Sequence, residues 1–99
     1  MSSVNRRQLE SVLQDEFDAP ISKSRPVARA AGDLADSGMY RDDAETALTI
    51  DHLIDELADA PDEYGLVERW NWWIQSLDLA YGTYHQFSVV NWDDEGAKQ

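Results

Sequence analysis

Few residues in this chain have the types and the spacing that chemistry requires. His52 lies one helical turn before Asp55 and Glu56, and an imidazole with carboxylates at this spacing can begin a divalent metal site. No third ligand follows at a recognisable spacing, so we interpret the group as a solvated helix face and expect no metal ion or other cofactor. The chain has no Cys, which excludes disulfides, thiolate catalysis and Cys-based metal sites. Because no catalytic constellation or phosphate loop is visible, we expect that the protein is not an enzyme.

A stripe of apolar residues on the strongest predicted helix is the second candidate. Trp72 and Leu79 fall nearly opposite the main apolar face of that helix, and a helix with two apolar sides is buried on both or faces a partner. Either another segment of the chain covers the stripe, or it forms a homodimer contact to which Phe87, Val89 and Trp92 contribute. Stacking of a small ligand on Trp72 is a third alternative.

The charge balance indicates the solvent in which the protein works. The chain carries 20 acidic and 8 basic residues, a net charge of −12 on 99 residues, and Asp supplies 13 of the acids. Short acids dispersed in this way keep a protein hydrated in concentrated salt, where a Debye length of roughly 3 Å screens their repulsion. The composition resembles that of small acidic proteins of salt-loving archaea, and this resemblance implies no particular function. A mesophilic acidic partner protein is the alternative.

The N-terminal third departs from this acidic pattern. Residues 1–30 contain five bases and four acids, whereas the remainder contains three bases and sixteen acids. Within that third, residues 21–40 resemble the recognition helix of winged helix-turn-helix proteins. The resemblance implies a small DNA-binding regulator that uses Lys23, Arg25 and Arg29. Since phosphate contact supplies much of the affinity for DNA, the acidic total charge opposes this reading.

The helices that position these residues follow from hydrophobic periodicity and from capping signals. Asn5 caps a helix over residues 6–17, and a second helix starts near Ser24–Pro26 and ends at Gly38. A capping box of Asp42 with Glu45 begins a third helix over residues 43–58. The fourth helix starts at Pro61 and continues to the low eighties. Its main apolar face comprises Leu66, Val67, Trp70, Trp73, Ile74, Leu77 and Tyr81.

We therefore predict a mainly α protein, a compact bundle of about four helices with a short extended C-terminal segment. Residues 1–92 form a single helical domain, and residues 93–99 are expected to be a disordered acidic tail. No apolar run is long enough to span a bilayer, so we expect a cytoplasmic protein without a membrane partner. The predicted function is a non-catalytic, self-associating interaction or regulatory module. DNA binding is the alternative, and a metal- or small-ligand-binding protein is the third.

Overall fold

The computed structural model describes residues 5–89 of the chain. Its elements are α1 (Arg6–Phe17), α2 (Ile21–Ser37), α3 (Met39–Ala44), α4 (Ile50–Ala58), α5 (Leu66–Tyr81) and η1, a single 3₁₀ turn (His85–Phe87). No strand occurs in this range, and the predicted mainly α bundle is confirmed. None of the described helices is long and apolar enough to cross a membrane.

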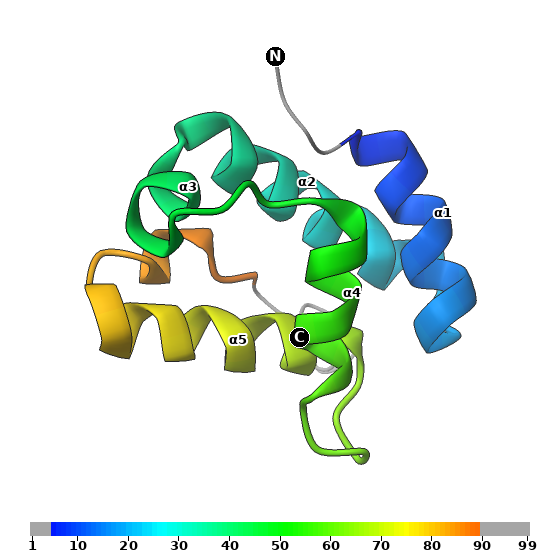
Figure 1. Ribbon diagram of the computed structural model, residues 1–99. Coiled ribbons are helices and arrows are strands. Elements are labelled where there is room, and N and C mark those ends of the chain that lie inside the picture. The colour runs from blue at the N-terminus through cyan, green and yellow to red at the C-terminus, as the bar shows by residue number, and fades with distance from the viewer. Residues whose placement is uncertain (1–4, 90–99) are drawn as a thin grey trace, which may run out of the picture.

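Helix α2 is the centre of the arrangement. It packs against α1 along most of its length and also contacts α3, α5 and η1, while α4 packs on α5 and touches α1. After α5 the chain reverses, and the segment that contains η1 returns between α5 and the α2–α3 pair (Figure 1, orange). The C-terminal segment therefore lies against two helices that are far apart in the sequence.

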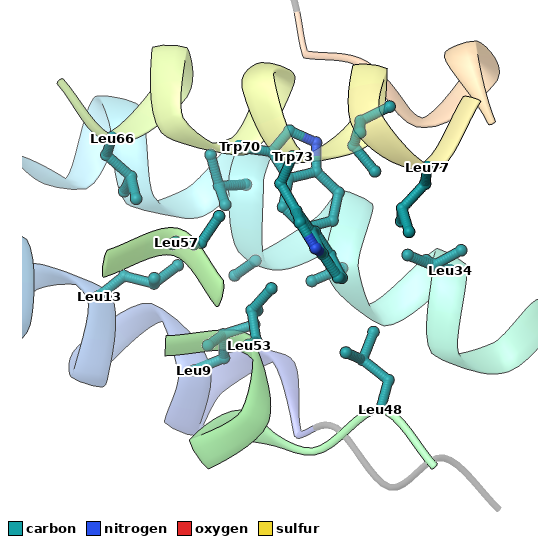
Figure 2. Close-up of a cluster of buried hydrophobic side chains, with 14 of the residues drawn as sticks. Leu9, Leu13, Leu34, Leu48, Leu53, Leu57, Leu66, Trp70, Trp73 and Leu77 are labelled. Atoms are coloured by element: carbon teal, nitrogen blue, oxygen red, sulfur yellow. The ribbon is translucent and has the colours of Figure 1, made fainter. Parts of the chain in front are cut away.

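The core forms where α1, α2, α4 and α5 converge. Trp70 and Trp73 project from α5 toward leucines of the other helices (Figure 2). Six of the seven residues predicted for the apolar face of α5 are buried, and only Tyr81 remains 47% exposed. The other buried residues of this core cluster are Leu9, Leu13, Val27, Ala28, Ala31, Leu34, Tyr40, Leu48, Leu53, Leu57 and Tyr84.

The first two helices show how far local signals determine helix ends. Helix α1 has its predicted bounds, and the Asn5 side chain accepts a hydrogen bond from the Gln8 amide at 3.0 Å. Helix α2, however, begins at Ile21, so the predicted start at Ser24–Pro26 is wrong. Ser24 is fully buried, and its hydroxyl has no hydrogen-bond partner among the described residues. Pro26 lies in the second turn, where it leaves the carbonyl one turn earlier without its helical amide partner.

The predicted continuous helix over residues 43–58 is also wrong. The chain forms two shorter helices, α3 and α4, because Glu45 adopts a left-handed conformation (φ 60°) that ends α3. The side chain of Thr49 then caps α4 by accepting from the His52 amide at 3.2 Å. This break allows Leu48, in the connecting loop, to enter the core (Figure 2). The burial of Leu48 therefore outweighs the local preference for one long helix.

Two capping signals in the sequence have other roles in the structure. Asp42 lies inside α3 and Glu45 is the C-cap of that helix, so the predicted capping box between them does not form. Pro61 lies in the turn before α5, which starts five residues later than predicted. The cap of α5 is Gly65, whose amide donates to the Glu68 carboxylate at 2.7 Å. A carboxylate in the first turn also interacts favourably with the helix dipole.

Candidate functional site

The aromatic run Trp70–Trp73 of α5 divides its side chains between the core and the surface. Trp70 and Trp73 are buried, and their rings meet edge to face with centroids 5.6 Å apart. Tyr40 of α3 packs on Trp73 at 5.5 Å. Such pairs contribute about 0.5–1.5 kcal/mol beyond the area that they bury. These two tryptophans therefore connect α5 to the rest of the core.

Two side chains of this run hold the C-terminal segment by its backbone. The indole N–H of Trp70 donates to the Phe87 carbonyl at 2.8 Å. The Asn71 carboxamide donates to the Val89 carbonyl and accepts from the Val89 amide, both at 2.8 Å. We call Trp70 and Asn71 the backbone clamp. Phe87 and Val89 are half-buried against the core, so this chain uses much of their apolar surface within the monomer. Trp92 and the acidic tail lie outside the described residues.

Trp72 lies on the outer side of the same run. It is half-buried and lines an open hollow of about 290 Å³ with Tyr64, Glu68, Asn71 and Gln75. Two turns further along, Leu79 is 85% exposed. The C-terminal segment binds beside Asn71 and leaves Leu79 uncovered. The structure thus places Trp72 and Leu79 at the surface of α5, as a stripe that the described residues cover only in part.

Four of the five bases of the N-terminal third gather in the groove between α1 and α2. Arg6, Arg7, Arg25 and Arg29 surround a hollow of about 210 Å³, together with Glu10 and Ala28. Arg25 donates to Glu10 at 2.9 Å, which neutralises it. Arg7 and Arg29 have no carboxylate partner among the described residues. Lys23, the third predicted DNA contact, is half-buried and interacts within the chain.

Arg6 explains the glycine inside α2. Its guanidinium pairs with Asp33 at 2.9 Å and Asp36 at 3.0 Å, and these bonds raise its pKa. To reach them, the side chain crosses Gly32 so closely that a Cβ there would clash with its Nε. Gly32 therefore provides the space through which α1 is bound to the last turns of α2.

The His52 group forms a hydrogen-bonded cluster with α3. The His52 Nε2 lies 2.6 Å from the Tyr40 hydroxyl and 3.7 Å from the Glu56 carboxylate, whereas Asp55 is exposed. Burial is the main cause that raises the pKa of Tyr40. Within residues 5–89, no three metal-ligating side chains converge, so the structure brings no third ligand to His52. The other histidine, His85, has an 82% exposed side chain.

These features define a small all-α domain in which one aromatic helix organises the core, clamps a following segment and presents a tryptophan to solvent. The chain belongs to the WNWW domain family, whose model matches residues 1–78. The four letters of that description are the residues Trp70-Asn71-Trp72-Trp73 of α5. Comparison with curated proteins and with solved structures found no match to this chain.

Sequence reasoning missed two of the residues that the structure brings forward. Asn71 carried no signal beyond its position among three tryptophans, because its role depends on a segment that folds back from residue 89. Arg7 was counted among the bases but not assigned to the DNA-binding set, because the separation of α1 from α2 in space was unknown. Both roles arise from contacts between segments that lie far apart in the sequence.

Proposed function

We propose that this protein is a non-catalytic, self-associating interaction module that works in the cytoplasm at high salt. The observation that carries the proposal is the position of Trp72, the one tryptophan of the family run that is only partly buried, where it packs against the core and lines an open hollow. Tryptophan is among the residues that most often dominate binding energy at protein interfaces. Leu79 continues the apolar surface along α5.

At a two-fold contact, the burial of Trp72 and Leu79 would contribute to the free energy of association from both subunits. Each large apolar side chain that leaves water contributes roughly 1.5–3 kcal/mol, and a two-fold contact buries the same residues twice. Repulsion between two chains of charge −12 opposes the contact at low salt. Molar salt screens charges beyond roughly 3 Å, so we expect association to strengthen as salt rises.

Sedimentation equilibrium in molar salt tests the proposal. Wild-type protein should approach twice the chain mass of 11.2 kDa, and Trp72→Glu should give a folded monomer because a buried charge without a partner is costly. Ile21→Glu is the matched control, because Ile21 is a 49% exposed apolar residue on α2. It should leave the dimer intact. Equal loss of dimer in both variants, or a monomeric wild type, would contradict an interface on α5.

DNA binding is the second candidate, and the pair of uncompensated arginines favours it. Arg7 and Arg29 face one hollow from two helices, and within residues 5–89 no carboxylate pairs with either of them. Phosphate contacts by arginine supply most of the sequence-independent affinity for DNA. Of the residues that the sequence singled out, Arg29 fits this role best, since Glu10 already neutralises Arg25.

A fluorescence anisotropy titration with duplex DNA, at the lowest salt that keeps the protein folded, tests this second candidate. Arg29→Ala and Arg7→Ala should each weaken binding and reduce its salt dependence. Arg41→Ala, an exposed arginine on α3, is the control and should have little effect. Absence of binding at low salt, where attraction to phosphate is strongest, would exclude the candidate.

A further inference from the structure

We propose that the C-terminal segment of residues 84–89 also binds the α2–α5 groove of a second copy of this chain, so that two copies exchange segments. The proposal deepens the self-association proposed above and rests on it, but it uses a different surface. In the exchanged dimer, each segment makes the contacts that it makes here within one chain. The closed monomer and the exchanged dimer therefore differ mainly in the conformation of the hinge. The balance between them depends on the protein concentration.

The hydrogen bonds from α5 that hold the segment are made to its backbone atoms. Trp70 bonds the Phe87 carbonyl, and Asn71 bonds both backbone groups of Val89. A carboxamide that pairs with one residue in both directions imitates a neighbouring β-strand, which is how extended peptides are bound by strand addition. The clamp lies within the part of the chain that the family model matches, and the clamped segment lies beyond it. This groove therefore binds a segment by its backbone, here a 3₁₀ turn followed by the extended residue Ser88.

Open surface hollows flank the segment on both sides. One of about 300 Å³ lies between it and Pro26, Arg29, Ala30 and Asp33 of α2. Another of about 350 Å³ lies on the α5 side, beside Ile74, Gln75 and Asp78. Solvent therefore reaches the segment from both sides, and Tyr84 is its one fully buried residue, which donates to Asp43 at 2.7 Å. In the exchanged dimer, the second copy's Tyr84 occupies that position.

The hinge between α5 and the segment disfavours the closed state. Gly82 has φ 83° and ψ 157°, a region that is open in practice only to glycine, and Thr83 has φ 65°. A non-glycine residue in the left-handed region stores strain. Short hinges under strain invite exchange, because opening them into an extended connection removes the strain. The segment is therefore joined to its own groove by a strained hinge, and it can make the same contacts in the groove of a second copy.

Hinge variants should move the equilibrium in opposite directions. Gly82→Ala makes the closed turn less favourable and should strengthen dimerisation by about tenfold or more, whereas Thr83→Gly relieves the turn and should weaken it by about as much. Both positions are exposed or half-exposed, and Gly82 has open space around its Cβ position. Sedimentation equilibrium in molar salt gives both dissociation constants. Shifts in one common direction would overturn the hinge argument.

Isotope-filtered NMR of the wild-type protein gives the direct test. Labelled and unlabelled chains are unfolded together and refolded in molar salt, and NOEs are sought between the Asn71 side-chain amide of one chain and the Val89 methyls of the other. Such NOEs support exchange. A dimer without them, which Trp72→Glu dissociates, overturns exchange and leaves the α5 interface standing. A monomer at the concentration used for NMR overturns both proposals.

Discussion

The carboxamide of Asn71 makes with Val89 both hydrogen bonds that a neighbouring β-strand would make. Its Nδ2 donates to the Val89 carbonyl and its Oδ1 accepts from the Val89 amide, each at 2.8 Å. Backbone groups that leave water need hydrogen-bond partners, and no strand exists among residues 5–89 to provide them. One helical side chain therefore replaces a strand and lets a single segment close the groove of an all-α fold.

We predict that Asn71→Ala releases this segment. Loss of both bonds leaves part-buried backbone groups unpaired, so the free energy of unfolding should fall by about 1–3 kcal/mol. Hydrogen exchange at the Val89 amide should accelerate further than exchange in α1, because the clamp acts locally. Gln75→Ala, one turn away on the exposed side of α5, is the control. Unchanged protection at Val89 would show that the segment is held by other contacts.

Trp73 should be among the most costly residues to truncate. It is 3% exposed and packs on both Trp70 and Tyr40, and Trp→Ala changes in cores cost about 3–5 kcal/mol. Leu79→Ala, on the exposed side of the same helix, should change stability by less than about 0.5 kcal/mol in dilute protein. Urea melts of the two variants check this contrast. Similar losses for both would mean that the inner and outer faces of α5 are wrongly assigned.

Replacement of Pro26 should stabilise the protein. Because Pro26 lies in the second turn of α2, Ala restores a helical hydrogen bond that proline forbids. The greater freedom of the unfolded Ala variant opposes this gain by about 0.4–1 kcal/mol. Removal of the roughly 3 kcal/mol helix penalty of proline, less this opposing term, should therefore raise the free energy of unfolding by about 2 kcal/mol. Thermal melts of Pro26→Ala measure it, and a lower melting temperature would indicate that Pro26 contributes packing that outweighs the restored bond.

Asp78 should make stability depend on pH in the acid range. The backbone amide of Tyr84 donates to its carboxylate at 2.9 Å and, as the largest cause, holds the pKa of Asp78 below its usual value. Since the folded pKa is lower than the unfolded one, this contribution is complete above about pH 4 and is lost as pH falls through the folded value. Asp78→Asn should therefore show a weaker acid dependence in melts between pH 6 and pH 2. Parallel curves for the two proteins would contradict this role.

Salt should stabilise the fold itself. Between molar salt and about 0.1 M the Debye length grows from roughly 3 Å to 10 Å, and the repulsion within a chain of charge −12 increases. The melting temperature of Trp72→Glu, predicted to be monomeric, should fall steadily over this range, which separates folding from association. A melting temperature independent of salt would contradict adaptation to high salt.

The sequence predicted best those elements whose apolar face repeats over several turns. The face of α5 and the bounds of α1 are confirmed because periodicity and a local cap agree there. The sequence-based prediction was wrong where the position of a residue depends on a contact with a distant part of the chain. Leu48 is buried in the core from a loop that interrupts the predicted helix, and Ser24 is buried where a helix cap was expected. The Trp72 stripe was visible from spacing alone, whereas the clamp of Asn71 required knowledge of where residue 89 returns.

The position of Tyr84 has a consequence for the minimal folding unit of this family member. The family match ends at residue 78, but Tyr84 is fully buried and bonded to Asp43 of α3. A chain that stopped at residue 78 would expose the cavity that this ring fills and would leave the Trp70 indole N–H without its acceptor. We therefore expect a chain that folds on its own to continue at least through residue 89, which makes the folding unit longer than the range that the family model matches.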